Sequence, residues 1–274
     1  MTSISSLQNT RIKQIIKLRN RRNRNKENLT IVEGVREIRQ ALNNNLLPSA
    51  AFVCPKLISE KDNVDIVSRL ATLETCGSTI VYEITPEVYA KIAYRGESGG
   101  ILLLLPYWPC LLNNLPIKEK ALFAIVENAE KPGNVGAILR TAEAAGVDGV
   151  VICSSEDVAS SDIFNPNVIR ASLGTVFSLP VAVATTDETI QWLRNHQIQI
   201  IATMPDAEMR YTAVNMIQST AIITGSEAFG LSKSWSTHAD QTVTIPMQGS
   251  INSLNLSVST ALLVYEAIRQ RGTL

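Results

Sequence analysis

A chain of 274 residues has room for one large domain or two of modest size. Hydrophobic residues make up 45% of it and charged residues 18%, a balance that excludes an intrinsically disordered protein. Apolar runs such as Ile101–Leu105 and Ala221–Ile223 are far shorter than the roughly 20 residues that span a bilayer. The N-terminus also lacks the residue order of a signal peptide, so the sequence predicts a cytoplasmic protein with no membrane partner.

The cysteines and histidines do not form a recognisable metal-binding pattern. Cys54, Cys76, Cys110 and Cys153 are scattered, with no Cys-x-x-Cys pair, and the chain has only 2 histidines. Structural zinc sites need four such ligands at short spacings. We therefore expect no bound metal and, in a reducing compartment, no disulfide.

The formal net charge is zero, but the basic residues are concentrated near the N-terminus. Between positions 11 and 26 there is no acid, and the basic residues of this stretch are Arg11, Lys13, Lys17, Arg19, Arg21, Arg22, Arg24 and Lys26. Such a basic arm favours contact with phosphate groups over a merely solvated face.

Helical and β-type patterns alternate through the first hundred residues. Ile12, Ile15 and Ile16 predict one basic amphipathic helix over residues 8–25. Gly34 then separates a strand from the next helix. The predicted strands are Leu29–Val32, Ala50–Val53, Thr79–Tyr82 and Ile101–Leu105, and the further helices cover residues 35–42, 62–72 and 86–93. These elements predict a compact α/β sandwich over residues 1–106.

Prolines at positions 106, 109 and 116 break any regular element, so we expect a linker over residues 107–119. A second α/β domain is expected over residues 120–274. Its predicted strands are Leu122–Val126, Gly149–Ile152, Phe177–Val181, Ile198–Ala202, Thr220–Thr224 and Val243–Ile245. Their continuous apolarity is typical of a parallel sheet covered by helices on both faces. Leu254–Arg271 predicts the C-terminal helix.

The first chemical motif is the segment from Glu127 to Gly146, in which a strand ends, a Pro-Gly turn follows and Asn134 begins a helix. It is a ligand-facing position in an α/β domain, although Gly133 and Gly136 do not fit a dinucleotide fingerprint. An ordinary helix cap at Asn134 and a solvated Arg140 would explain the same residues.

Two more loops combine glycine with polar residues. In the second motif Gly225 and Gly230 flank Glu227, which lets backbone approach a ligand closely; a plain strand–turn–helix connection capped by Ser232 is the alternative. The third motif, Ile245–Asn255, enters the last helix at Ser253 or Asn255, and both residues are good caps. Polar Ser257, Ser259 and Thr260 inside that apolar helix need a further explanation.

In this order and spacing the three motifs resemble those of the SpoU (TrmH) family of RNA 2′-O-ribose methyltransferases, within the SPOUT superfamily. The resemblance covers residues 121–271, and Arg170-Ala-Ser172-Leu-Gly174-Thr175 is similar to the family's segment between motifs one and two. It implies a parallel α/β sheet with a deep trefoil knot, S-adenosylmethionine as cofactor, and a homodimer whose subunits share each active site.

The resemblance also implies roles for individual residues. The catalytic positions fall on Asn134, Arg140, Glu227, Ser253 and Asn255. The cofactor-binding positions fall on Thr203, Gly225, Ser226, Ile245, Met247, Ser253 and Leu254. This chain departs from the family's pattern at Asn252, where members often carry glutamate, and at the bulky Ala228-Phe229 pair. These departures concern local RNA contacts and not the reaction.

The N-terminal sandwich resembles the L30e-like RNA-binding module of rRNA-modifying relatives. Its expected RNA-binding residues, together with one from the second domain, are Arg11, Lys13, Lys17, Arg19, Arg21, Arg22, Lys26, Arg36 and Arg170. A large N-terminal substrate domain favours ribosomal RNA, with transfer RNA as the alternative. A non-catalytic rRNA-binding relative is a rival interpretation. So is a base methyltransferase with a cysteine nucleophile, although none of the three loops contains cysteine.

Overall fold

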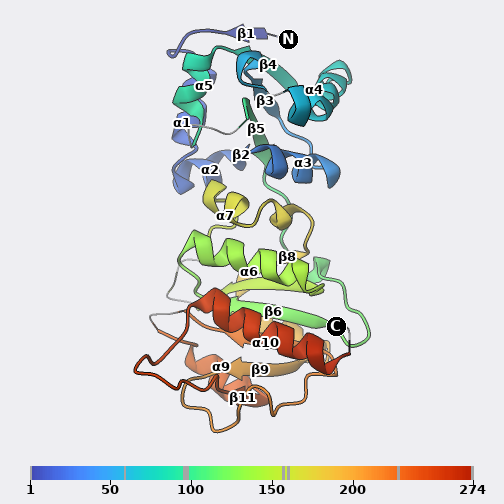
Figure 1. The fold of residues 1–274 in the computed structure, drawn as a ribbon, viewed down its shortest axis with the longest axis vertical. Helices are drawn as coiled ribbons and strands as arrows, with labels where there is room; N and C mark the ends of the chain where they lie inside the picture. The colour runs from blue at the N-terminus through green and yellow to red at the C-terminus, as the bar shows by residue number, and fades with distance from the viewer. Residues whose placement is uncertain are drawn as a thin grey trace. The chain divides into compact units, whose positions relative to one another are not determined.

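The computed structural model describes residues 2–58, 60–94, 99–155, 158, 161–226 and 229–272. The chain divides into two compact units (Figure 1). Unit 1 comprises Met1–Trp108 and Asp162–Ser178, and unit 2 comprises Pro109–Ser161 and Leu179–Leu274. The segment Asp162–Ser178 therefore clusters with the N-terminal part of the chain, whereas the sequence places it inside a domain of residues 120–274. The expected domain of residues 120–274 therefore stays a prediction.

Unit 1 is a mixed sheet between two layers of helices. Its strands are β1 (Thr2–Ile4), β2 (Leu29–Glu33), β3 (Ala50–Val53), β4 (Ile80–Ile84) and β5 (Ile101–Pro106), in the order β1-β4-β3-β5-β2. Its helices are α1 (Thr10–Lys17), α2 (Arg21–Glu27), α3 (Val35–Asn43), η1 (Pro55–Leu57), α4 (Glu60–Thr75), α5 (Pro86–Ile92), α7 (Pro166–Ala171) and η3 (Thr175–Phe177). Strand β5 runs antiparallel to β2 and β3, while β4 is parallel to β1 and β3.

The helix expected over residues 8–25 is wrong in one respect, because the chain forms two helices there. Helix α1 ends at Lys17, and Asn20 caps α2 by accepting the backbone N–H of Arg22 at 2.8 Å. Asn23 in turn donates to the carbonyl of Lys17 at 2.9 Å. Asparagine side chains compete with the helical backbone for its hydrogen bonds, which explains the break. Ile12 and Ile15 still pack into the core of unit 1, as their spacing predicts, and Ile16 packs against it while partly buried. Leu18, which was not among the predicted residues, is buried there as well.

Unit 2 is a parallel sheet of six strands, in the order β11-β9-β10-β6-β7-β8. The strands are β6 (Leu122–Glu127), β7 (Gly149–Ser154), β8 (Val181–Thr185), β9 (Gln199–Thr203), β10 (Thr220–Thr224) and β11 (Gln241–Val243). The helices are η2 (Leu112–Asn114), α6 (Pro132–Ala144), α8 (Thr186–Asn195), α9 (Lys233–His238) and α10 (Leu256–Gln270). Helices α6 and α10 pack together, and α8 packs with α9. The expected parallel sheet is confirmed.

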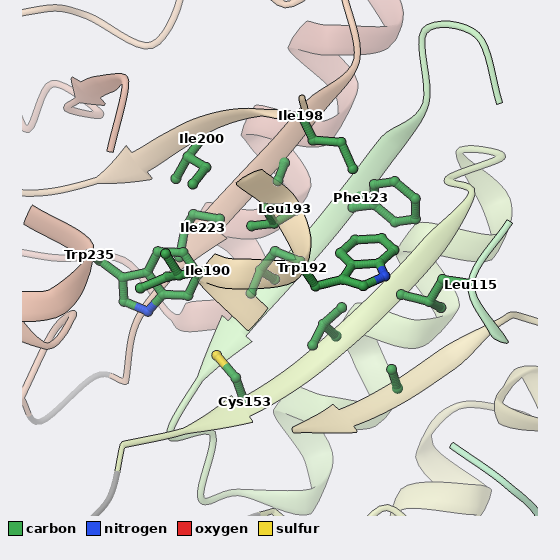
Figure 2. Close-up of a cluster of buried hydrophobic side chains, with 14 of the residues drawn as sticks. Leu115, Phe123, Cys153, Ile190, Trp192, Leu193, Ile198, Ile200, Ile223 and Trp235 are labelled. Carbon is green, nitrogen blue, oxygen red and sulfur yellow. The ribbon is translucent and has the colours of Figure 1, made fainter. Parts of the chain in front are cut away.

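The core beneath α8 and α9 explains why these strands are apolar along their whole length. Phe123, Trp192 and Leu115 gather at one end of the cluster, and Trp235 lies with Ile190 and Ile223 at the other (Figure 2). The Phe123 and Trp192 rings meet edge to face, with centroids 5.2 Å apart. Strand residues of alternating direction fill both covered faces, so no polar alternation is possible.

Several predicted element boundaries in unit 2 are wrong. The strand expected at Val243–Ile245 instead covers Gln241–Val243, and the helix expected from Leu254 begins at Leu256, after its cap Asn255. The strand expected at Phe177–Val181 begins only at Val181, because Thr175–Phe177 form a 3-10 turn. That turn follows Gly174, whose φ of 81° ends the preceding helix. Helix α6 begins at Pro132 and not at Asn134, since proline is well suited to the first turn of a helix.

Candidate active site

A cavity of about 810 Å³ opens at the carboxyl edge of the unit 2 sheet. Its walls come from the chain that leaves β9, β10 and β11, and from the first turn of α10. Ligands of open parallel α/β sheets bind at this edge, because the loops that follow the strands converge there. The volume is in the range of a small-molecule site.

All seven residues expected to hold the cofactor line this one cavity: Thr203, Gly225, Ser226, Ile245, Met247, Ser253 and Leu254. The hydroxyl of Thr203 is buried and, among the described residues, has no hydrogen-bond partner. A buried polar atom of this kind is normally satisfied, so a ligand in the cavity is a natural partner for it. Ile251 and Leu256 add apolar surface to the same walls, which suits an adenine ring.

Gly225 is the tightest point of the second loop. A Cβ atom at this position would lie 2.4 Å from the carbonyl carbon and oxygen of Gly230 and 2.5 Å from the backbone nitrogen of Leu231. The Gly230 N–H donates to the Ser226 carbonyl at 2.9 Å and closes the loop on itself. Glycine is therefore required at Gly225 by the close approach of two backbone segments.

The structure joins two of the expected catalytic residues. The Asn255 side-chain amide donates to the side-chain oxygen of Asn134 at 3.1 Å, which links the third motif to the first. Asn255 also caps α10, since its side-chain oxygen accepts the backbone N–H of Ser257 at 2.9 Å. It lies between Leu254 and Leu256, which both line the cavity. Of the two caps that the sequence left open, Asn255 is the one that forms.

Arg140 lies on α6, six positions after Asn134, and does not line the cavity of its own chain. Its side chain is exposed and has no hydrogen-bond or ion-pair partner in the described part of the chain. An offset of six residues places the two side chains about 120° apart around a helix of 3.6 residues per turn. Glu227, the remaining expected catalytic residue, lies outside the described residues.

The structure explains two of the polar residues that stood out in the apolar sequence of α10, and their contacts differ. Ser259 lines the cavity. Buried Thr260 meets the hydroxyl of Thr224 at 2.9 Å and donates to the Leu256 carbonyl at 2.9 Å. Thr224 is the last residue of β10, so this pair ties the start of α10 to the strand from which the second loop leaves.

Glu127 was not among the expected site residues, yet it is a fully buried carboxylate at the carboxyl end of β6. It accepts hydrogen bonds from the Ser232 N–H at 2.6 Å, the Ser232 hydroxyl at 2.7 Å and the Thr186 hydroxyl at 2.5 Å. Ser232 precedes α9 as expected, but its hydroxyl does not cap that helix. The one feature of the sequence that could have indicated Glu127 is its position as an acid at the end of an otherwise apolar strand.

The neighbouring cysteine is unsuited to nucleophilic chemistry. Cys153 pairs with Glu127 across β6 and β7 and is fully buried. Burial, and then the charge of Glu127, raise the pKa of the Cys153 thiol well above its usual range. Burial also raises the pKa of Cys110 to about 12. Both cysteines are therefore thiols at neutral pH, and the thiolate is the reactive form.

The basic residues of unit 1 fall into two groups. Arg19 donates to the carbonyls of Lys91 at 3.0 Å and Ala93 at 2.9 Å, and Arg24 is buried and paired with Asp162. Arg170 lies 3.5 Å from the carboxylate of Glu33. Arg11 donates to Gln14, and Arg21 has partners of its own. Of the expected RNA-binding residues, those with an exposed side chain and no side-chain hydrogen bond or ion pair to another described residue are Lys13, Lys17, Arg22, Lys26 and Arg36.

Among the described residues, no group of three or more His, Cys, Asp or Glu side chains could hold a metal ion. Within the same residues no helix has the length and apolarity that a membrane crossing requires.

Two known families match separate parts of the chain. Residues 121–265 match the SpoU rRNA Methylase family, and residues 9–103 match the MRM3-like substrate binding domain. The 23S rRNA (guanosine(2553)-2′-O)-methyltransferase of Bacillus subtilis strain 168 is 26% identical over 97% of this chain and 98% of its own length.

Two solved structures are similar over nearly the whole chain. A crystal structure of an RNA 2′-O ribose methyltransferase is 34% identical, with a TM-score of 0.82, and covers 98% of this chain and 99% of its own. The SpoU methyltransferase AviRb from Streptomyces viridochromogenes, in complex with the cofactor AdoMet, is 26% identical with a TM-score of 0.83. That match covers 97% of this chain and 100% of the AviRb chain.

Proposed function

The chain belongs to the SpoU rRNA methylase family of S-adenosylmethionine-dependent RNA ribose 2′-O-methyltransferases, and we propose that it modifies a ribose of 23S ribosomal RNA. The observation that carries the site assignment is the single cavity lined by all seven expected cofactor residues. The full-length match to a 23S rRNA methyltransferase favours ribosomal over transfer RNA. A ribosomal substrate implies a cytoplasmic location.

The residues of the cavity suit S-adenosylmethionine. When bound, the cofactor supplies an electrophilic methyl group on a sulfonium. Backbone groups of the loops at Gly225 and Met247 can approach the cofactor closely, while Ile245 and Leu254 offer apolar walls. In our proposal Asn134 and Asn255, joined by their 3.1 Å hydrogen bond, orient the ribose beside Ser253. Holding two reactants in place is a large part of the acceleration of such a reaction.

We assign Arg140 the role of a fixed cation. The 2′-hydroxyl is a poor nucleophile until its proton is lost or polarised, and an arginine cannot remove that proton because its guanidinium stays protonated up to about pH 12. A guanidinium can, however, stabilise a developing alkoxide and hold an adjacent phosphate. In this scheme the proton passes to solvent.

Arg140 does not line the cavity of its own chain, so we propose that it serves the cavity of a second subunit. The face that supports a homodimer is an exposed apolar stripe on α10, formed by Val258, Leu262 and Tyr265 at helical spacing. Helix α10 packs beside α6, the helix that carries Arg140. Sedimentation at micromolar concentration should therefore give a dimer mass for the wild type.

A charge on the stripe tests the dimer and the shared site together. Leu262→Glu should give a monomer, since a desolvated carboxylate opposes burial of this face. Lys56→Glu, which changes charge on an exposed residue of unit 1, is the control and should remain dimeric. If Leu262→Glu were monomeric and as active as the wild type, the shared-site proposal would be wrong.

The choice of RNA is tested by methyl transfer to separated ribosomal and transfer RNA, with the full chain and labelled S-adenosylmethionine. We expect label in 23S rRNA. Label only in tRNA would contradict the proposed substrate. Binding of rRNA with no transfer to any RNA would support the non-catalytic rival. The cysteine-dependent rival is already disfavoured by the raised pKa of Cys153 and Cys110.

A further inference from the structure

The buried carboxylate of Glu127 has no part in the chemistry proposed above, yet it holds Ser232, two residues after the cavity-lining Gly230. Three donors converge on its two oxygens, at 2.5 to 2.7 Å. Two of them belong to Ser232, which is the first residue after the second loop, and one belongs to Thr186 at the start of α8. A fully buried carboxylate is tolerated only when its oxygens are satisfied in this way.

The loop that Ser232 ends is also held at its beginning. Thr224, the residue before it, is bound to Thr260 of α10 at 2.9 Å. Between these ends, Gly225 packs against the backbone of Gly230 and Leu231, and Gly230 is hydrogen-bonded to Ser226. Gly225, Ser226 and Gly230 all line the cavity. Of the two anchors, the one at Ser232 depends on a single buried side chain, Glu127.

We propose that Glu127 is a positioning residue, which through Ser232 fixes Gly230 and Leu231 at the end of the second loop and thereby sets the Gly230 wall of the cofactor cavity. This inference rests on the proposed site for S-adenosylmethionine. The Thr186 contact satisfies the same carboxylate but lies on α8, which contributes no residue to the cavity. The contacts of Ser232 and Thr186 therefore have different consequences, although all of them are hydrogen bonds to the same buried carboxylate.

The experiment compares variants of the full chain by calorimetric titration with S-adenosylmethionine and by thermal unfolding without it. Glu127→Gln keeps the shape but turns an NH₂ group toward a donor, so the dissociation constant should rise about tenfold or more. Ser232→Ala removes the hydroxyl donor on the loop and should raise it severalfold. Ser232→Thr retains a hydroxyl and should restore binding to near the wild-type value.

Thr186→Val is the matched control. It removes one donor to Glu127, as Ser232→Ala does, and should lower the unfolding temperature by a similar amount, yet change the dissociation constant by less than about twofold. Arg271→Ala is a second control for instability alone. The Arg271 guanidinium donates to the carbonyls of Met216 at 2.9 Å and Gln218 at 2.7 Å, where the chain approaches the amino end of β10.

Equal weakening of cofactor binding by Ser232→Ala and Thr186→Val would overturn the proposal, because Glu127 would then be a stability element only. Wild-type binding by Glu127→Gln would overturn it as well. Should Glu127→Gln fail to fold, the Ser232 and Thr186 pair still decides the question. A wild-type protein that binds the cofactor but methylates no RNA would contradict the proposed function and leave this inference standing.

Discussion

At the scale of single residues, the sequence motifs led to most of the cofactor cavity but not to its supports. The family resemblance implied Gly225 and Met247, and both line the cavity. Glu127 was missed, since one acid at the end of a strand carries no periodic signal. The charge pattern of the sequence also does not predict which basic residues are exposed. Arg24 belongs to the basic arm in the sequence, yet it is buried and paired with Asp162. Burial of a charged side chain depends on a partner more than a hundred residues away.

Arg140 gives the first prediction. If it acts as a fixed cation, Arg140→Lys should keep part of the methyl-transfer rate, because the charge remains although the planar fork is lost. Arg140→Ala should lose about 3 kcal/mol of transition-state stabilisation, by analogy with a single oxyanion-hole donor. The dissociation constant of S-adenosylmethionine should barely change, since Arg140 does not line the cavity.

The measurement is single-turnover methyl transfer across a range of pH. If Arg140→Lys and Arg140→Ala both had a negligible methyl-transfer rate, a general-base role would be favoured instead. This would hold particularly if the pH–rate profile of the wild type showed one ionisation that was absent from the profile of Arg140→Ala. An alanine variant with full activity would remove Arg140 from the mechanism.

A pair of glycines gives the second prediction. Gly225→Ala forces a Cβ to within 2.4 Å of the Gly230 backbone, so the second loop must move. Gly249 also lines the cavity, but a Cβ there would meet nothing within 4 Å. We expect Gly225→Ala to abolish measurable cofactor binding and Gly249→Ala to leave it within about threefold, since only the first creates a backbone clash. Equal affinities in a calorimetric titration would show that the loop is not held as described.

At the scale of elements, some predicted boundaries agree with the structure, and others fail where side chains compete with the backbone for hydrogen bonds. The strand Thr220–Thr224 was predicted as it is observed. Residues 8–25 form two helices because Asn20 and Asn23 bind backbone groups. The short strand Thr2–Ile4 was missed, since three residues are too few for a pattern and its pairing with β4 is remote in sequence.

Helix α8 gives a prediction on pH. Its capping box joins Thr185 and Glu188, and hydrogen bonds from the Thr185 backbone and hydroxyl hold the pKa of Glu188 below its ordinary value of 4.5. A lowered folded-state pKa means that this contribution is complete above about pH 4.5 and is lost as pH falls through the folded-state value. Glu188→Gln should lower the free energy of unfolding near neutral pH and flatten its decline in acid.

Thr185→Ala should cost about 1 kcal/mol at neutral pH, as loss of a helix N-cap usually does. Chemical unfolding of both variants between pH 3 and 7 provides the measurement. A Glu188→Gln variant whose unfolding free energy falls in acid as steeply as that of the wild type would show that the box contributes nothing there.

At the scale of the whole chain, the α/β class, the parallel sheet and an N-terminal substrate-binding domain could be predicted from the sequence. The association of Asp162–Ser178 with unit 1 could not. In that unit the Tyr107 and Phe164 rings stack at 3.7 Å, and Thr30 donates to the Phe164 carbonyl at 2.5 Å. Contacts between residues so far apart in the sequence produce no periodic pattern from which they could be predicted. The trefoil knot, which the family resemblance implies, stays a prediction.

These contacts affect how RNA binding is best tested. Deleting residues 1–105 would strip Asp162–Ser178 of its packing, so neutralising exposed charges is the cleaner change. Lys13→Gln, Lys17→Gln and Arg22→Gln together should weaken rRNA binding and reduce the slope of log affinity against log salt by about 2 to 3, since each phosphate contact adds a little under 1. Lys120→Gln on unit 2 is the control and should leave the slope unchanged. An unaltered slope in the triple variant would move the RNA surface elsewhere.

The most direct test of the whole account is the chemical position of the transferred methyl group. The full chain is incubated with 23S rRNA and S-adenosylmethionine labelled in the methyl group, and the RNA is then hydrolysed completely in alkali. A 2′-O-methyl ribose lacks the hydroxyl that attacks the neighbouring phosphate, so the account predicts label in an alkali-stable dinucleotide, and much less of it with Arg140→Ala. Label released in mononucleotides would place the methyl group on a base and contradict the account.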